Sequence, residues 1–407
     1  METAQSANLP RGPHGRRKLG RPRLLIIGCG DVGLRIVSRL FTRFRVIALT
    51  STPARVAQLR AAGAVAIVGD LDRRESLRRL RGIAQRVMHL APPGESGSTD
   101  ARTRRLAALL APTIERAVYI STTGVYGDHG GALIDETARL RPANTRALRR
   151  IDAEQTMRHS LHASVLRVPG IYAHDRLPLD RLRKGVPALI EPDDVHTNHI
   201  HADDLARITI AALARGAPAR IYNAVDDSAL KMADYFDAVA HATSLPRPPR
   251  LPRAEVRAAL SPIAYSFFTE SRRLANRRLK RELRVSLSYP TVASTLATLA
   301  AEKTNGPGGA VGMMRGTSPL VSGAAETTRT GTIRRLIRRD FGEPVFALTF
   351  CRKMNRDPNR DQFLNDLRLP GHAHRCLEQV KSRAGFTRHC DIDESGFVSN
   401  WFAPLCG

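Results

Sequence analysis

Short apolar runs alternate with helical stretches along the chain from Arg23 to about Ala300, and this alternation predicts the order of its secondary structure. Six of these runs are four or five residues long, as strands of a buried parallel sheet often are. We expect helices to fill the gaps between them. The predicted strands are residues 24–28, 46–49, 64–68, 86–90, 117–121 and 164–168.

Regular alternation of strands and helices indicates an α/β fold with a doubly wound parallel sheet of the Rossmann type. We assign this domain to residues 23–176. Residues 177–302 alternate less regularly, and their clearest helical pieces are 202–213 and 229–242. They predict a smaller substrate lobe that is interleaved with the sheet. Polar loops of this lobe are expected to form the substrate side of a cleft.

The two ends of the chain depart from this pattern. Residues 1–22 are predicted to be a disordered basic leader, because the apolar stretch after Lys18 is only four residues long and a secretion signal needs about 7 to 15. Residues 303–333 have the Gly-rich, Pro-containing and small polar composition of a flexible linker. The tail, residues 334–407, contains the only Trp and has too little periodicity for a fold assignment.

Composition excludes several classes of protein. Hydrophobic residues make up 42% and charged residues 25%, as in soluble globular proteins, and no apolar run approaches the roughly 18 to 20 residues of a membrane helix. We therefore expect a cytoplasmic protein with no membrane contact. The net charge is +26, but the 64 basic residues include 7 Lys and so 64 − 7 = 57 Arg, spread along the whole chain. With 5% aromatic residues, this pattern favours a compositional bias over a nucleic-acid interface. Composition does not predict the oligomeric state.

The cysteines do not indicate a metal site. Four of the five lie in the last sixty residues, and neither a CxxC pair nor a zinc-ligand spacing is present. Cys29 lies inside a glycine-rich turn, where it is interpreted as a small residue that fits the turn rather than as a nucleophile. No metal is expected.

The segment 24–36 has the order strand, glycine turn, helix that binds dinucleotides. Gly28 permits the tight turn, Gly30 lets the backbone approach a pyrophosphate, and Gly33 allows the helix to pack against the strand. The amides of Asp31 and Val32 at the helix start are expected to bind the phosphates.

The second strand favours NADP over NAD. An NAD site usually has an acidic residue at the end of this strand, where it binds the ribose 2′-hydroxyl group. The chain has no acid between Phe41 and Gly69, and Thr50, Ser51 and Arg55 could instead hold a 2′-phosphate. Arg55 could also be a solvated helix residue.

Further cofactor contacts are predicted after the next two strands. Asp70 and Leu71 follow the third strand and are expected near the adenine, although Asp70 could instead only cap the next helix. Ala91 and Pro92 follow the fourth strand and are expected beside the nicotinamide.

Six motifs in a fixed order make the chain resemble the NAD(P)-dependent epimerase/dehydratase family, which belongs to the extended and atypical short-chain dehydrogenase/reductases. The resemblance covers residues 23–300 and excludes the leader and the tail. The motifs are GCGDVG at 28–33, VGDL at 68–71, LAPP at 90–93, YISTTGVYG at 119–127, LRVPGIY at 166–172 and NHIHADDL at 198–205.

This resemblance also implies where a catalytic site would lie. The family uses a Ser or Thr after the fifth strand to polarise the substrate oxygen, and Thr122 occupies that place. The usual Tyr and Lys, four residues apart on the next helix, are replaced by Arg146 and Arg150. Arg cannot shuttle a proton at neutral pH. Arg150 could still bring positive charge to the nicotinamide ribose, and Tyr126 is the nearest candidate phenol, although in this motif it is usually a packing residue.

Other polar residues have simpler interpretations. His201 and Asp204 fit hydrogen bonding at a helix start better than a substrate role, and the paired Asp135 and Glu136 fit a solvated or Arg-paired role better than acid/base work.

The glycine turn and the second strand therefore predict NADP binding, and the resemblance implies an oxidoreductase that transfers hydride at a carbinol or carbonyl carbon. Because the Tyr and Lys pair is absent, a sensor that binds NADP(H) without turnover is the alternative. The resemblance does not identify the substrate.

Overall fold

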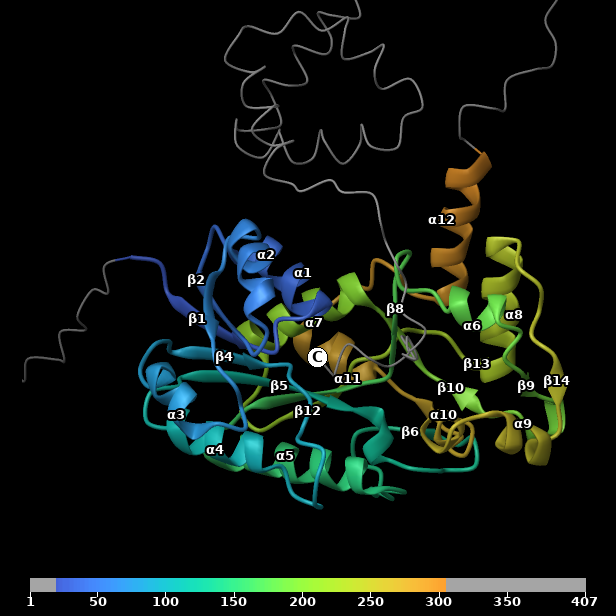
Figure 1. Ribbon diagram of the computed structural model, residues 1–407, viewed down its shortest axis with the longest axis horizontal. Helices are drawn as coiled ribbons and strands as arrows, with labels where there is room; N and C mark the ends of the chain where they lie inside the picture. Colours follow the sequence, from blue (N-terminus) through green and yellow to red (C-terminus); the bar gives the residue numbers. More distant parts are fainter. Residues whose placement is uncertain (1–19, 305–407) are drawn as a thin grey trace, which may run out of the picture. The chain divides into compact units, whose positions relative to one another are not determined.

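The computed structural model describes residues 20–304 (Figure 1). The predicted leader, except for residues 20–22, lies outside the described residues. So do residues 305–333 of the predicted linker, the whole tail 334–407 and the four cysteines after Cys29.

A seven-stranded parallel sheet forms the centre of the fold, in the order β12-β7-β5-β4-β1-β2-β3. The strand at Arg23–Ile27, beside the central strand, is buried from Leu24 to Ile27 because helices cover both faces of the sheet. The strands are β1 (Arg23–Ile27), β2 (Arg45–Thr50), β3 (Val65–Val68), β4 (Arg86–His89), β5 (Arg116–Thr122), β7 (Ser164–Val168) and β12 (Ile221–Asn223).

These strands confirm the predicted Rossmann-type α/β fold and the six strands expected from the apolar runs. The seventh strand, β12, was not predicted. It pairs with β7 at the edge of the sheet, so part of the range 177–302 completes the Rossmann sheet rather than the lobe.

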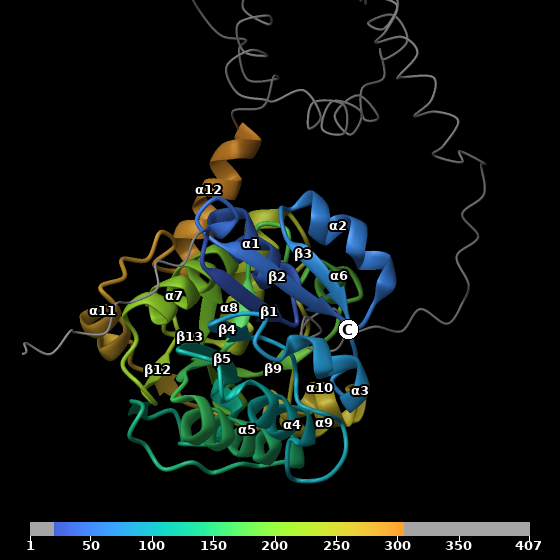
Figure 2. The same ribbon diagram turned by 90° about the vertical axis from the view of Figure 1, so that its left-hand side faces the viewer.

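Two layers of helices cover the sheet, as Figures 1 and 2 show. On one face, the apolar sides of four helices pack on alternate strand residues such as Leu24, Ile26 and Val118. They are α1 (Asp31–Leu40), α2 (Val56–Ala61), α7 (Ala202–Arg215) and α11 (Arg277–Leu283). The other face carries α3 (Arg74–Leu77), α4 (Ala101–Leu110) and α5 (Thr145–Leu161), packed on residues such as Leu25, Ile27 and Tyr119.

Local signals fix the ends of the helix nearest the candidate site. Asn144 caps α5, since its side-chain oxygen accepts a hydrogen bond from the Ala147 amide at 2.9 Å. The helix ends at His162, which adopts a left-handed conformation with φ of 48°. The first turn of α5 therefore begins at a defined position relative to the end of β5.

The lobe has its own apolar core, which includes Tyr172, Leu189, Phe236, Val239 and Phe268. Its helices are α6 (Leu179–Arg183), α8 (Met232–Thr243), α9 (Arg253–Ala259), α10 (Pro262–Ser266) and α12 (Val292–Thr304). The lobe strand pairs are β8 (Gly170–Tyr172) with β11 (His199–His201), β9 (Ala188–Leu189) with β14 (Arg250–Leu251), and β10 (His196–Thr197) with β13 (Leu230–Lys231).

The remaining elements connect these layers. β6 (Leu133–Ile134) pairs with β15 (Arg273–Leu274), and four short 3₁₀ helices are η1 (Pro53–Arg55), η2 (Arg78–Leu80), η3 (Thr123–Val125) and η4 (Glu191–Asp193). The predicted helices at 202–213 and 229–242 are α7 and α8, and α7 packs against α1 on the sheet. Within residues 20–304, no helix is long and apolar enough to cross a membrane.

Candidate active site

The glycine turn between β1 and α1 has the backbone that close contact requires. Gly28 has φ of +77°, and a Cβ atom there would lie 2.5 Å from the backbone nitrogen of Ala91. A Cβ atom on Gly33 would lie 2.9 Å from the Sγ atom of Cys29. Gly30 is the N-cap residue of α1, and the helix amides begin with Asp31 and Val32. The backbone of Ala91 packs directly against the turn at Gly28. The turn thus fits a dinucleotide phosphate.

Cys29 lies inside this turn, and its thiol is affected by burial and by the charge of Arg55. The Cys29 thiol is buried, and burial raises its pKa to about 11, which makes it a poor nucleophile at neutral pH. The positive charge of Arg55 opposes this rise in the pKa.

The other residues that were expected to contact the adenosine part of the cofactor follow or end β2 and β3. Thr50 is buried, and its hydroxyl oxygen accepts a hydrogen bond from the Thr52 amide at 3.2 Å, whereas Ser51 is exposed. The Arg55 Nε atom donates to Gln58. Leu71 is buried, and the Asp70 carboxylate accepts from the Asp72 amide at 2.9 Å, so it forms a turn before α3 and does not cap that helix.

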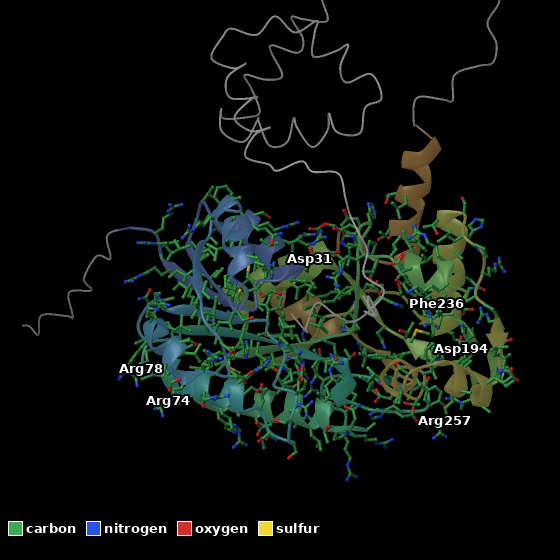
Figure 3. The ribbon with its side chains drawn as sticks, in the orientation of Figure 1. Asp31, Arg74, Arg78, Asp194, Phe236 and Arg257 are labelled. Carbon is green, nitrogen blue, oxygen red and sulfur yellow. The ribbon has the colours of Figure 1, made fainter. Side chains whose placement is uncertain are left out.

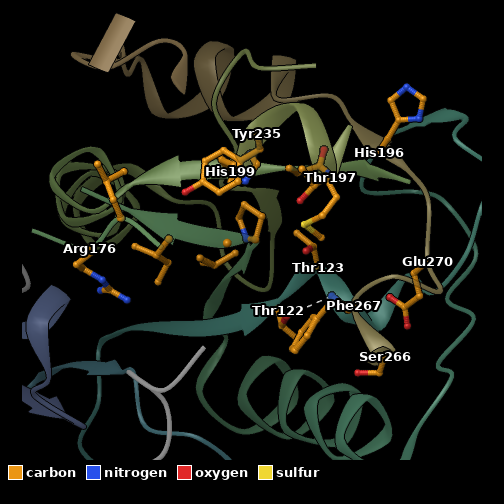
Figure 4. A pocket seen from close by; sticks show the side chains of 18 of the residues that line it. Thr122, Thr123, Arg176, His196, Thr197, His199, Tyr235, Ser266, Phe267 and Glu270 are labelled. Atoms are coloured by element: carbon orange, nitrogen blue, oxygen red, sulfur yellow. Dashed lines mark hydrogen bonds between the residues drawn. The ribbon is translucent and has the colours of Figure 1, made fainter. Parts of the chain in front are cut away.

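A cavity of about 760 Å³ lies where the carboxyl ends of β5 and β7 meet the lobe (Figure 4). Thr122 and Thr123 lie on one side of it, and His199 and Tyr235 lie on the opposite side. Asp31 extends the cavity to the glycine turn. Pro92 is half-buried and is not among the residues that line the cavity. A cleft between the sheet and the lobe was the predicted arrangement.

Thr122 is the predicted catalytic residue that lines this cavity. It is the last residue of β5 and caps η3, because its Oγ1 atom accepts a hydrogen bond from the Gly124 amide at 3.2 Å. The hydroxyl oxygen is thereby held, and its own proton can be donated to an acceptor in the cavity. Arg146, in the first turn of α5, also lines the cavity.

Tyr126 does not lie in the cavity, which corrects its assignment as a candidate acid. Its side chain is completely buried, and its hydroxyl group donates to Asn223 Oδ1 at 2.7 Å. The Arg167 guanidinium lies 4.7 Å from the ring centroid. Burial raises the pKa of the phenol. Tyr126 is a packing residue, as this motif usually has.

Arg150 is also buried, which corrects the expectation that it brings charge to the nicotinamide ribose. It is only 1% exposed, and its Nη1 atom donates to the Tyr119 hydroxyl at 3.0 Å and to the Ile120 carbonyl at 3.1 Å. Its guanidinium group therefore ties α5 to β5. The positive charge that reaches the cavity from α5 belongs to Arg146.

Several other polar residues have the structural roles that were favoured. His201 caps α7 by accepting from the Asp203 amide at 3.2 Å, as expected. The buried Asp204 has a structural role other than the expected helix-start hydrogen bond, because it accepts from the Tyr289 amide at 2.8 Å. Glu136 accepts from the Asn223 amide and lies 3.5 Å from Arg278. Asp135 accepts from the Thr137 amide. In the described part of the chain, no group of three or more His, Cys, Asp or Glu side chains could hold a metal.

Sequence reasoning missed the lobe side of the cavity. His199 and Tyr235 stack with ring centroids 4.1 Å apart, and burial lowers the pKa of His199 to about 3. Arg272 is buried and donates to Glu270 at 2.7 Å. His199 lay inside the motif at 198–205 and could have been noticed there. Tyr235 and Arg272 follow no motif, and only the folded lobe brings them to the cavity.

Comparison with known proteins links this architecture to nicotinamide cofactors. Residues 28–215 match a family model described as NAD(P)H-binding. A functionally unknown conserved protein from Silicibacter pomeroyi is 30% identical in sequence, with a TM-score of 0.59 over 69% of this chain and 99% of its own.

Two more distant structures share the fold. DesIV, a dTDP-glucose 4,6-dehydratase from Streptomyces venezuelae, was solved as a double mutant with NAD and DAU bound. It is 20% identical, with a TM-score of 0.56 over 70% of this chain and 97% of its own. The human epimerase family protein SDR39U1, solved with NADPH, is 18% identical, with a TM-score of 0.56 over 69% of this chain and 99% of its own.

Proposed function

We propose that the chain, whose residues 28–215 match an NAD(P)H-binding family model, is an NADP(H)-dependent oxidoreductase of the NAD(P)-dependent epimerase/dehydratase family of extended short-chain dehydrogenase/reductases. Its substrate would be a small molecule with a carbinol or carbonyl carbon, held in the cavity of about 760 Å³. The observation that carries this proposal is Thr122, whose hydroxyl group is fixed on the cavity wall at the end of β5.

The choice of NADP over NAD rests on the end of β2. No carboxylate is present there to bind a ribose 2′-hydroxyl group, and Arg55 follows the strand end in η1 with a positive charge that acts on Cys29 in the glycine turn. A 2′-phosphate would form charge-assisted hydrogen bonds with Arg55 and with the hydroxyl groups of Thr50 or Ser51. Among the relatives, the human protein was solved with NADPH and the dehydratase with NAD, so the chain's own residues must decide between the cofactors.

The cavity residues support hydride transfer without a tyrosine acid. Bound NADP(H) would supply or accept the hydride. Thr122 would donate a hydrogen bond to the substrate oxygen, and the guanidinium of Arg146 would stabilise the negative charge that develops on this oxygen during carbonyl reduction. Because Arg146 keeps its proton, a water molecule would protonate the resulting alkoxide. Turnover is therefore expected to be slow, since general acid catalysis typically contributes about 10²- to 10⁴-fold.

A screen of aldehydes, ketones and alcohols with NADPH and NADP tests this proposal. With any substrate found, Thr122→Val should lower kcat/KM by about 10²- to 10³-fold and change the NADPH affinity less than twofold, because its hydroxyl addresses the substrate. Arg146→Met should lower kcat, and Arg146→Lys should recover part of the loss. Thr113→Val, after the end of α4 and away from the cavity, is the matched control. Unchanged activity in Thr122→Val would refute the assignment.

A non-catalytic NADP(H) sensor is the second candidate. The specific observation in its favour is that α5 has Arg at both positions of the usual Tyr and Lys, while Tyr126 is buried away from the cavity. A protein that binds NADPH tightly but turns over nothing in the screen would favour the sensor over the oxidoreductase.

A further inference from the structure

An ion-pair network joins the glycine turn to the loop that follows β8. The Asp31 carboxylate, in the first turn of α1, accepts from Arg35 Nε at 3.0 Å and from Arg176 Nη1 at 2.8 Å. Asp31 and Arg176 both line the cavity. Figure 3 labels Asp31, and Figure 4 shows Arg176 at the edge of the cavity. The loop thus places a cation beside the helix start that receives a cofactor's phosphates.

The acid at this position needs explanation. A dinucleotide diphosphate carries negative charge and binds at the first amides of α1, so the Asp31 carboxylate would repel it unless nearby cations compensate. In the network, Asp31, Asp175 and Asp203 face Arg35, Arg39 and Arg176. The three carboxylates and the three guanidinium groups carry equal and opposite charge. A bound diphosphate would therefore add negative charge to a network whose net charge is zero.

The two arginines that contact Asp31 differ in how many donors they have left. Arg35 uses all three of its nitrogens, on Asp31, Asp203 and Asp175. Within residues 20–304, the side chain of Arg176 hydrogen bonds only to Asp31, through Nη1. A guanidinium group has five N–H donors, so most of those on Arg176 remain available. Its side chain is 17% exposed, and it is held beside the helix start with donors to spare.

We propose that Arg176 is a diphosphate-binding residue of the cofactor site, which contacts the NAD(P)H diphosphate from the lobe side. Asp31 orients the guanidinium group, and the diphosphate receives the remaining N–H groups in a charge-assisted contact. His174 and Leu177, on either side of Arg176, line the same cavity. Cofactor binding would therefore also fix the loop that forms part of the substrate wall. This inference rests on the cofactor binding in the proposed function and not on catalysis.

A purely structural role would make Arg176 only the counter-ion of Asp31, and a double-mutant cycle separates the two roles. If Arg176 binds the diphosphate itself, removing its charge weakens cofactor binding whether or not Asp31 is charged. If it only neutralises Asp31, its removal has no effect once Asp31→Asn has removed the acid.

Calorimetric titration of the full-length protein with NADPH and with NADH provides the test. Arg176→Met, which keeps an unbranched apolar stem, should raise the Kd for both cofactors by about 10- to 100-fold, since both contain the diphosphate. A rise, which is smaller because Asp31 no longer orients the guanidinium group, should also occur in the Asp31→Asn background. Arg39→Met is the matched control, because Arg39 belongs to the network, pairs with Asp203 at 2.7 Å and does not line the cavity. Its Kd should change less than twofold, and thermal unfolding should show that all variants are folded.

Two results would overturn the inference. If Arg176→Met has no effect in the Asp31→Asn background, Arg176 is a counter-ion only, and the proposed function stands. If the unaltered protein binds neither NADPH nor NADH, the proposed function fails together with this inference.

Discussion

The Tyr126 hydroxyl group donates its proton to Asn223 Oδ1 inside the core, whereas the Thr122 hydroxyl group, four residues earlier, lies on the cavity wall. Both residues belong to one motif, at 119–127, and the spacing in that motif cannot separate them. The burial of each side chain and the partner of each oxygen decide their roles. Thr122 carries the proposed chemistry, and Tyr126 links β12 to the turn after β5.

Tyr126→Phe is therefore expected to change stability and not activity. The substitution leaves the buried Asn223 Oδ1 without its donor, which should lower the free energy of unfolding by about 1–3 kcal/mol. Urea unfolding measures this loss. Tyr265→Phe is the control, because the described structure gives its hydroxyl group no hydrogen bond. A large fall in kcat without a loss of stability would reinstate Tyr126 as an acid.

Asp226 is a buried carboxyl group that should make stability depend on pH. Burial raises its pKa from 3.8 to about 7, although Ser228 and Tyr172 donate hydrogen bonds to it. Because the pKa is higher in the folded state, the stabilisation is fully present below about pH 4 and is lost as the pH rises through about 7.

Asp226→Asn, which resembles the neutral acid, should remove this dependence. Between pH 5 and pH 8, the unaltered protein should lose about 2–4 kcal/mol of unfolding free energy relative to the variant. Denaturant unfolding of both proteins at the two pH values measures the difference. Parallel pH profiles for the two proteins would show that Asp226 is ionised in the folded state throughout.

At the scale of elements, the glycine turn depends on the contact between α1 and β1. A Cβ atom on Gly33 would meet Cys29 Sγ at 2.9 Å and Cys29 Cβ at 3.3 Å, so the helix can approach the strand only if residue 33 has no side chain. Both conflicting atoms belong to one small residue.

Gly33→Ala should therefore destabilise the protein by about 1–3 kcal/mol through overpacking. Adding Cys29→Ala removes the sulfur atom and should recover part of this loss, which urea unfolding of the four variants in the cycle would show. An additive cycle, with no recovery, would mean that the clash lies elsewhere in the turn.

Strands were predictable from the sequence where at least four apolar residues follow one another or nearly so. The six apolar runs from residue 24 to residue 168 each gave a strand. For the inner strands the cause is burial on both faces of a parallel sheet, which leaves a run of hydrophobic residues, whereas β3 lies at the edge of the sheet and is partly exposed. β12 was missed since it has only three residues, Ile221–Asn223, and ends in a polar one. Most lobe strands have two residues, too few to show any periodicity.

At the scale of the whole molecule, the candidate site is assembled from distant segments. The glycine turn and Thr122 follow recognisable motifs, and the sequence located them. Arg176 and Tyr235 reach the cavity only because the lobe folds over the carboxyl ends of β5 and β7, and Arg150 was misplaced because position along α5 does not reveal which way a long side chain turns. Tertiary packing decides which lobe residues reach the cavity and which way the Arg150 side chain points. A single sequence does not show this packing directly.

Calorimetric titration of the full-length protein with NADPH and NADH shows whether this fold holds NADP(H). A charge-assisted contact to the 2′-phosphate contributes on the order of 1.5 to 3 kcal/mol, so NADPH should bind at least about tenfold more tightly. Arg55→Met should remove most of this preference and leave the NADH affinity unchanged. Equal affinities, or tighter binding of NADH, would contradict the account.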